Sequence, residues 1–508
     1  MDKRFWSLLV ILLACIFAAY SNVYDMQYVY DDEFYIQKNQ FLNSFSNIFN
    51  IFATNATAGA GFQDSFYRPI QFFFYLITAQ TLGSHEWSYH FLNVFLHAIN
   101  AVLLFLLSQI LGFKKEWAFA VALIWGLHPV HTEAISYISG TADPLQFFFI
   151  FLTLITFFKK PQGYLGLCAF FFTCAFLSKE VAIVFPGLLV SLLFLTQENR
   201  WKVKTYFPAL FFLGIALIYV ALRATVLDFN GDFHFYKTEN IYTQNMHFRA
   251  FTFLATLPKY FMLLIYPQDL HIDRAFPVHV DFLSRDVIFG FFMVMTLVFS
   301  SSYLLYKKRK SGIFLTAMTV WFFAAHSLHS GILVPMNSLF LEHWLYVPSV
   351  AAIWGFIFIL QRLPIKYGMA VVATIAILCG GLTYQQNRMW ESPITLFSRI
   401  LKMNPKATRV RHNLAMAYSD QGQDDLAQRE YETVLSADER PYPQTYHNLA
   451  LLYLKRNRID EGEKLLLKAI EISPNFHPSY DYLIQLYQFK NDEGKVREWT
   501  EKKAKLSL

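Results

Sequence analysis

The sequence predicts an all-α membrane protein of about eleven transmembrane helices, followed by a small helical domain. Of its 508 residues, 55% are hydrophobic and only 16% are charged, whereas about a quarter of a soluble domain is charged. Apolar runs of roughly 15–22 residues alternate with short polar breaks, and such runs suit a bilayer core of about 30 Å. The composition becomes charged and amphipathic near Tyr384. We therefore expect a membrane domain over 1–384 and a separate domain over 385–508.

Basic residues orient the membrane domain, because cytoplasmic loops carry an excess of Lys and Arg. The basic clusters are Lys3/Arg4, Lys114/Lys115, Lys159/Lys160, Arg200/Lys202/Lys204, Lys307/Lys308/Arg309/Lys310 and Arg362/Lys366. Placing all of them in the cytoplasm puts the N-terminus inside and the C-terminal domain outside. The predicted spans are 5–22, 90–110, 117–134, 144–158, 163–178, 181–196, 204–224, 286–306, 312–330, 345–361 and 366–384.

Three further apolar stretches are predicted to lie at the membrane surface. Residues 69–82 and 251–266 would each reverse the orientation if they spanned, so we interpret them as interfacial or re-entrant helices. Phe41–Phe52 places Phe and Ile at helical spacing with Asn and Ser opposite, which predicts a helix lying flat on the outer leaflet. The outer loops over 23–89 and 225–285 are long, and long loops in compact domains usually carry function.

The C-terminal region repeats itself. His412-Asn413-Leu414-Ala415 recurs 35 residues later as His447-Asn448-Leu449-Ala450, and Tyr453 recurs 34 residues later as Tyr487. This period and pattern resemble the tetratricopeptide repeat, with about three helix pairs. Stacked pairs form an α-solenoid with a concave groove. We expect that groove to hold an acceptor protein or another protein partner.

Ionisable residues gather on the predicted outer side. A charge at membrane depth costs at least about 2.5 kcal/mol, so each is a candidate for function. The candidates are Asp31 and Asp32 in the first loop, Arg68, His128 with His131, Glu133 and Asp143, Lys179 with Glu180, and Glu342 with His343.

Each candidate has a structural alternative. The adjacent carboxylates of Asp31, Asp32 and Glu33 repel, which raises the pKa of at least one and favours a general base; the alternative is a solvated acidic loop. Arg68 suits a phosphate through paired hydrogen bonds, or it reaches lipid headgroups. Lys179 and Glu180 either pair with each other or direct Lys179 at an anionic lipid headgroup.

The histidine cluster leaves three interpretations open. His128 and His131 share a helix face if Pro129 begins a helix there, and with Glu133 they could bind a metal. Their spacing differs from that of zinc-binding helices, so hydrogen bonding to a phosphate or sugar competes, as does a structural polar cap. No cofactor is predicted, and a divalent cation requirement stays open. The net charge of +6 is assigned to loops that set orientation, not to nucleic-acid binding.

The order of these motifs resembles a known family. It comprises Asp31-Asp32, Tyr67-Arg68-Pro69, HFLNVFLHA from His90, HPVHTEAI from His128, GTADPL from Gly140, LSKE ending at Glu180 and EHWLYVPS from Glu342. Together with the repeats, this order resembles the transmembrane and tetratricopeptide-repeat-containing O-mannosyltransferases. The resemblance implies a C-type glycosyltransferase fold and a polyprenyl-phosphate sugar donor used on the lumenal or periplasmic side.

The resemblance also implies roles for residues. Asp31 would be the catalytic base with Asp32 as its neighbour. Phosphate and sugar binding would fall to Arg68, His128, His131, Glu133, Asp143, Lys179, Glu180, Glu342 and His343. The sequence departs from the animal members in its short repeat array and in having His343 where they usually have Arg. We therefore expect a bacterial member with a different acceptor.

The predicted function is transfer of a mannose-like sugar to an acceptor hydroxyl, such as that of protein Ser or Thr. The predicted location is the bacterial inner membrane with a periplasmic repeat domain, or the endoplasmic reticulum in a eukaryotic host. Two alternatives remain: a membrane scaffold whose repeats recruit a partner, and a transporter of lipid-linked sugar. A transporter would need charges near the bilayer midplane, whereas these charges gather at one face.

Overall fold

The computed structural model describes residues 3–159, 163–227, 240–437 and 442–506. Every regular element within these ranges is helical, so the predicted all-α class is confirmed. The contacts divide the chain into two compact units, Met1–Ser392 and Pro393–Leu508. Helix α16 (Ile365–Asn387) continues through residue 384, so the change in composition falls inside a helix. Lys160 and part of the 225–285 loop lie outside the described residues.

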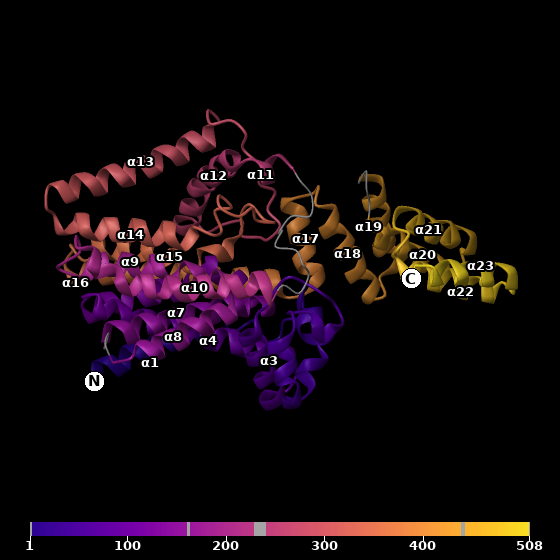
Figure 1. The fold of residues 1–508 in the computed structure, drawn as a ribbon, viewed down its shortest axis with the longest axis horizontal. Coiled ribbons are helices and arrows are strands. Elements are labelled where there is room, and N and C mark those ends of the chain that lie inside the picture. Colours follow the sequence, from indigo (N-terminus) through magenta and orange to yellow (C-terminus); the bar gives the residue numbers. More distant parts are fainter. Residues whose placement is uncertain (1–2, 160–162, 228–239, 438–441, 507–508) are drawn as a thin grey trace. The chain divides into compact units, whose positions relative to one another are not determined.

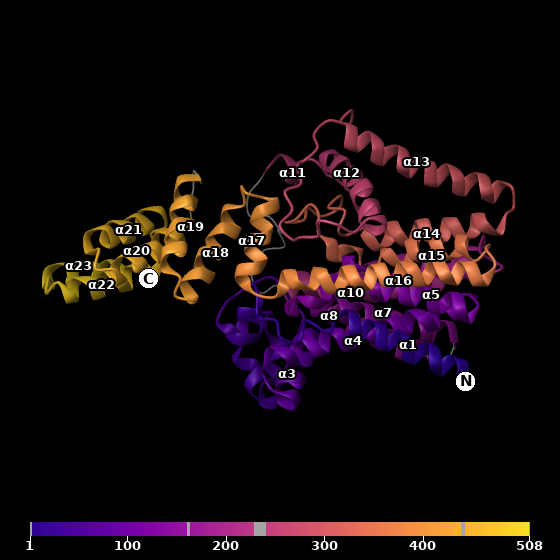
Figure 2. The ribbon, with the colours of Figure 1, turned by 180° about the vertical axis from the view of Figure 1, so that it is seen from behind.

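The first unit is built from long apolar helices (Figures 1 and 2). Helix α4 packs against α5 and α7, α7 packs against α8, and α9 packs against α14. Helices α13 and α14 form a hairpin, and α12 packs on α13. The bounds are α1 Lys3–Ala19, α4 Glu86–Ile110, α5 Lys115–Leu127, α7 Ala142–Lys159, α8 Leu165–Ser178, α9 Phe185–Thr196, α10 Phe207–Thr225, α12 Met246–Ile265, α13 Arg285–Tyr306, α14 Lys310–His326 and α15 Ser349–Leu360.

Within the described ranges, six helical segments are long and apolar enough to cross a membrane. They are Glu86–Ile110, Ile138–Lys159, Val203–Thr225, Met246–Ile265, Arg285–Tyr306 and Ile365–Trp390. The protein is therefore an integral membrane protein, and the count of eleven spans stays a prediction. Helix α12 contains most of residues 251–266, which were expected at the interface. It is 20 residues long and apolar enough to cross a membrane. Helix α3 (Pro69–Leu82) has only 14 residues.

The first loop differs from the expected flat helix. Residues Phe41–Phe52 do not form one helix but two 3-10 turns, Gln40–Asn43 and Phe45–Asn47, and the short helix α2, Ile48–Ala53. The reason is local: Ser44 is extended, at φ −157°, and its hydroxyl accepts a hydrogen bond from the Ser46 amide. Such side-chain bonds compete with a continuous helix. Phe49 still lies 82% exposed.

The second unit consists of consecutive helix pairs, as the repeat pattern predicted. After α17 (Pro393–Met403), the pairs are α18 with α19, α20 with α21, and α22 with α23. The repeated histidines lie between pairs: His412 is bonded to Thr445 at 2.9 Å and His447 to Ser479 at 3.0 Å. The bounds are α18 Thr408–Asp420, α19 Asp424–Ala437, α20 Pro443–Lys455, α21 Ile459–Ile472, α22 His477–Phe489 and α23 Glu493–Ala504.

Candidate functional site

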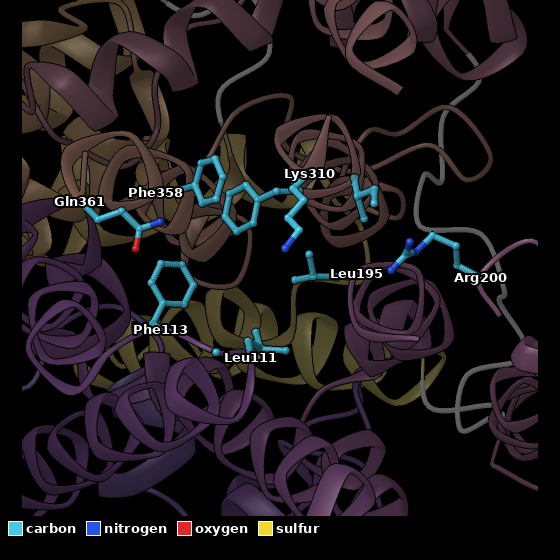
Figure 3. A pocket seen from close by; sticks show the side chains of 10 residues that line it. Leu111, Phe113, Leu195, Arg200, Lys310, Phe358 and Gln361 are labelled. Atoms are coloured by element: carbon cyan, nitrogen blue, oxygen red, sulfur yellow. The ribbon is translucent and has the colours of Figure 1, made fainter. Parts of the chain in front are cut away.

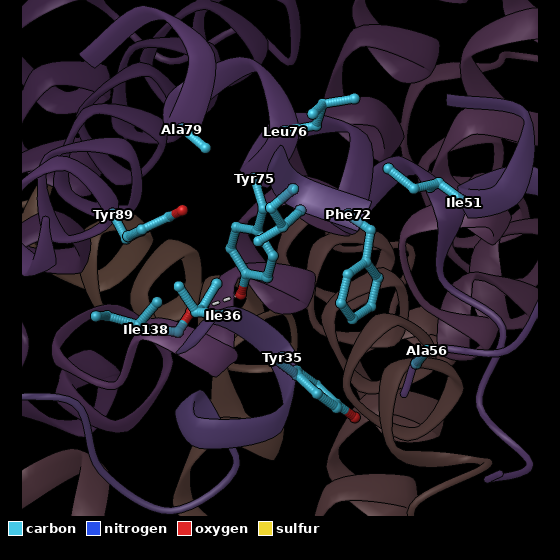
Figure 4. Packing of buried hydrophobic residues seen from close by; sticks show 11 residues of the cluster. Tyr35, Ile36, Ile51, Ala56, Phe72, Tyr75, Leu76, Ala79, Tyr89 and Ile138 are labelled. Carbon is cyan, nitrogen blue, oxygen red and sulfur yellow. Dashed lines mark hydrogen bonds between the residues drawn. The ribbon is translucent and has the colours of Figure 1, made fainter. Parts of the chain in front are cut away.

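The first loop is held against the membrane helices by an apolar cluster (Figure 4). Tyr35 and Ile36 of the loop are buried together with Phe72 and Tyr75 of α3. The Tyr75 hydroxyl donates a hydrogen bond to the carbonyl of Ile138 at 2.9 Å. This packing fixes the loop segment that carries the acidic residues, because a buried aromatic side chain loses contacts if the segment moves.

The two adjacent aspartates occupy opposite environments. Asp32 is fully buried and accepts hydrogen bonds from the Val29 amide at 3.0 Å and from the Ser139 amide and hydroxyl at 2.9 and 2.5 Å. Asp31 is exposed. Burial raises the pKa of Asp32 to about 7, against the lowering effect of the bonds from Ser139 and Val29. Asp32 thus anchors the loop, whereas the neighbouring residue Asp31 is exposed.

The backbone on either side of Asp31 is also fixed. Tyr30 has φ +52°, an uncommon left-handed conformation for a residue with a side chain. Its hydroxyl donates to Asp273 at 2.6 Å. The Asp31 amide donates to the Tyr137 hydroxyl at 3.1 Å, and Tyr137 stacks on Trp390. Unusual backbone conformations that persist are held by their surroundings and gather at functional sites.

Arg68 lies at the start of α3 and forms a two-pronged ion pair. Its Nη2 and Nε atoms donate to the two carboxylate oxygens of Glu180 at 2.8 and 3.2 Å. Burial raises the pKa of the Tyr35 hydroxyl, the charge of Arg68 opposes this shift, and the charge of Asp31 adds to it. Arg68 and Asp31 therefore both act on one side chain of the first loop, although they come from different elements.

Lys179 pairs with Asp143 and not with its neighbour Glu180. The Lys179 ammonium lies 2.7 and 2.9 Å from the two carboxylate oxygens of Asp143. Lys179 is extended, at φ −158°, between α8 and the following 3-10 turn. Lys179 is extended whereas Glu180 begins the 3-10 turn Glu180–Val184, and the two adjacent side chains reach separate partners. The alternative in which they pair with each other is therefore wrong.

The adjacent residues Glu342 and His343 also bind separate partners. Glu342 accepts from Arg274 at 2.8 Å and from the His271 amide at 2.9 Å. His343 Nδ1 lies 2.8 Å from a carboxylate oxygen of Glu133, whose second oxygen accepts from the His343 amide at 3.0 Å. A small cavity is lined by Asp143, His329 and His343, among others. It therefore lies between the His343–Glu133 pair and the Lys179–Asp143 pair.

The predicted histidines His128 and His131 are buried within the helix bundle. His128 Nε2 is bonded to the Leu264 carbonyl at 3.1 Å, and its Nδ1 accepts from the Val130 amide at 3.3 Å. His131 is fully buried, with its ring 4.8 Å from that of Trp125 and 4.9 Å from that of Tyr346. Pro129 begins a 3-10 turn, Pro129–His131. Within the described ranges, no group of three or more His, Cys, Asp or Glu could hold a metal ion.

Several residues that contact the predicted site residues, or line a cavity with them, were not predicted from the sequence. They are Tyr137, Ser139, His271, Asp273, Arg274 and His329. Three of them, His271, Asp273 and Arg274, lie in the long loop between α12 and α13. The only signal for these three was the length of that loop. Ser139 lies one residue before the GTADPL motif, and nothing in the sequence marks it as a partner of Asp32.

The burial of Glu342 predicts a dependence of stability on pH. Burial, and next the nearby charge of Glu133, raise the pKa of Glu342 from 4.5 to about 8, against the opposing effect of Arg274. Between these values the folded protein holds a proton that the unfolded chain has released, so the free energy of unfolding falls as pH rises. We expect a slope on the order of 1 kcal/mol per pH unit at most.

The measurement is the Tm of the full chain in detergent from pH 5 to pH 8. Glu342→Gln imitates the protonated form at every pH and should flatten the decline. Glu391→Gln is the matched control, because Glu391 is exposed, and it should follow the wild type. An unchanged slope in Glu342→Gln would contradict the assignment.

The fold and these pairs define a polytopic membrane protein with a polar site at one end of its helices and a repeat domain after them. Comparison with known families identifies two matching regions. The dolichyl-phosphate-mannose-protein mannosyltransferase family matches residues 68–224. The tetratricopeptide repeat family matches 408–441 and 443–476. The first match includes Arg68, Lys179 and Glu180 and begins after Asp31 and Asp32.

Curated relatives match this chain over different shares of its length. The chain is 32% identical to human protein O-mannosyl-transferase TMTC2 over 40% of its own length and 26% of the relative. It is 23% identical to Caenorhabditis elegans protein O-mannosyl-transferase F38B6.6 over 85% of its length and 62% of the relative. It is 22% identical to human protein O-mannosyl-transferase TMTC3 over 94% and 56%. The alignments thus cover about a quarter to three fifths of these relatives.

The chain is therefore a homologue of the transmembrane and tetratricopeptide-repeat-containing O-mannosyltransferases, and the recognition made from its motifs is confirmed.

Proposed function

We propose that this protein is a glycosyltransferase that moves a mannose-like sugar from a polyprenyl-phosphate donor to an acceptor hydroxyl. The observation that carries the proposal is the exposed Asp31, fixed on a buried and hydrogen-bonded Asp32. A rigid, accessible carboxylate at the rim of a helical bundle suits proton transfer from an acceptor that approaches from the aqueous side. The names of the relatives support the reaction class.

In the proposed reaction, the acceptor oxygen attacks C1 of the sugar while the bond from C1 to the phosphate oxygen breaks. Asp31 takes the proton of the acceptor hydroxyl, and polyprenyl phosphate leaves with the bonding electron pair. Polyprenyl phosphate is already a good leaving group, so no strong general acid is required. A single displacement of this kind inverts the configuration at C1, as in inverting glycoside chemistry.

The departing phosphate needs positive charge nearby. Arg68 is the first candidate, because a guanidinium has five donors and the Glu180 pair uses two of them in the structure. Lys179 and His343 are further candidates, each paired with a carboxylate at 2.7 and 2.8 Å. Glu180, Asp143 and Glu133 hold these three cations in place, and Glu342 accepts a hydrogen bond from Arg274 at 2.8 Å. His128 and His131, whose surroundings are backbone and aromatic rings, support the wall of the site.

We also propose that the site faces the periplasm, or the lumen in a eukaryotic host, with a cytoplasmic N-terminus and the repeats outside. The basic clusters support this orientation. The repeats would then lie in the same compartment as the acceptor and could present an acceptor protein. The bacterial inner membrane is the proposed location.

The test is sugar transfer in membranes that contain the full chain, from labelled polyprenyl-phosphate mannose to endogenous proteins. We expect label on protein that is absent from membranes without the chain. The same assay with polyprenyl-phosphate glucose and other sugars separates a wrong donor from a wrong reaction class. Failure with every polyprenyl-phosphate sugar would contradict the proposal and favour the scaffold alternative.

A further inference from the structure

A second polar hollow lies at the helix ends remote from the candidate site (Figure 3). Four elements show this placement. Helix α5 runs from the Phe113 end to His128, α9 from just after Glu180 to near Leu195, α14 from Lys310 to His326, and α15 from near Tyr346 to Gln361. In each of these helices, the hollow lies at one end and the candidate site lies at the other. At 1.5 Å per residue, helices of this length separate the two by roughly 20 Å.

Two cations face this hollow. Lys310 begins α14, and Arg200 lies in the loop after α9. Figure 3 shows the Lys310 ammonium and the Arg200 guanidinium directed into the same space. The Arg200 Nε atom donates to the Phe194 carbonyl at 2.9 Å, which fixes the direction of the guanidinium. Gln361 adds an amide, and no acidic residue is among the described lining residues.

The remaining wall of the hollow is apolar. Phe314 stacks on Phe358 with ring centroids 4.1 Å apart, and Phe113 meets Phe314 edge to face. Leu111, Leu195 and Ile313 complete this wall. The hollow therefore offers two positive charges and an amide beside hydrocarbon and aromatic surface. This combination matches a phosphate group that is attached to acyl chains.

We propose that this hollow binds the phosphodiester headgroup of an anionic glycerophospholipid. The phosphate would sit between Arg200 and Lys310, and its glycerol and upper acyl carbons would lie against the Phe113–Phe314–Phe358 wall. The bundle end favours this occupant over a free phosphate, because it also carries the Lys307–Arg309 turn and Arg362, which attract an anionic membrane surface. Basic pockets between membrane helices are suited to such headgroups. The site is independent of the proposed transfer reaction.

The test measures lipid binding to the full chain, purified in detergent, by native mass spectrometry. The probes are phosphatidylglycerol, phosphatidylcholine as the zwitterionic control, and inorganic phosphate as a competitor. The variant Arg200→Gln/Lys310→Gln should bind phosphatidylglycerol about tenfold more weakly than the wild type. The matched variant Lys202→Gln/Lys204→Gln loses the same charge at the same bundle end, outside the hollow, and should bind as the wild type does.

The single variant Lys310→Gln, at an exposed position, keeps the test valid if the double variant does not fold, and it should show a smaller loss of the same sign. Equal losses in both double variants would overturn the proposal, because they would indicate diffuse charge attraction. Equal binding of phosphatidylcholine would overturn it as well. Displacement of phosphatidylglycerol by millimolar inorganic phosphate would overturn the lipid assignment in favour of a free-phosphate site.

Discussion

Replacing Asp31 by Asn should lower the rate of sugar transfer by about 10²- to 10⁴-fold, the range that a positioned general base contributes. Asn has the same shape as Asp but cannot take the proton from the acceptor hydroxyl. Because Asp31 is exposed and Asp32 makes the buried contacts of the loop, the fold should survive. The measurement is the initial rate at saturating donor, with the Tm recorded on the same preparation. We expect a loss in kcat with little change in the KM for the donor.

Two neighbouring variants serve as controls for this prediction. Glu33→Gln removes the third carboxylate of the run, which is paired with Lys38 at the surface, and should leave the rate nearly unchanged. Asp32→Asn removes an acceptor of the bonds from Val29 and Ser139, so it should lower the Tm and the rate together. If Asp31→Asn kept more than about a tenth of the rate, Asp31 would not be the base.

The pattern of charges predicted which residues are candidates for the site but not how they pair. Arg68, Asp143, Lys179 and Glu342 stand out because a charge beside an apolar run is costly unless it is satisfied. Their partners depend on where the chain breaks between helices. Lys179 and Glu180 are adjacent in sequence, yet they bind Asp143 and Arg68. An extended residue between two helices sets these directions, and apolar periodicity carries no signal for it.

The loops were the least predictable part of the fold for a related reason. Membrane helices are predicted from hydrophobic length alone. The helix predicted over Phe41–Phe52 is instead interrupted at Ser44, whose side chain competes for a backbone donor. Arg274 lies in a polar loop where a charge costs nothing in isolation. Only its contact with the buried Glu342 makes it part of the site. Long-range contacts of this kind are set by the fold.

Breaking the buried Lys179–Asp143 pair should produce the largest change in stability. Lys179 is 7% exposed and Asp143 is 8% exposed, so Asp143→Leu leaves an ammonium buried without its carboxylate. Removing one partner of a buried pair costs about 3–5 kcal/mol. Lys179→Met should cost a similar amount. The measurement is unfolding of the full chain in detergent, by heat or by increasing SDS. Lys38→Met, which breaks the exposed pair with Glu33, should cost under about 1 kcal/mol.

The double variant Asp143→Leu/Lys179→Met then separates structure from function. Replacing both charges by apolar side chains of similar size is often neutral, so the double variant should recover most of the stability that either single variant loses. In the proposed reaction Lys179 also supplies positive charge toward the departing phosphate. Transfer should therefore stay low in the double variant although its Tm returns. Recovery of both stability and transfer would show that the pair only holds α7 beside the segment after α8, and would leave Arg68 and His343 to meet the phosphate.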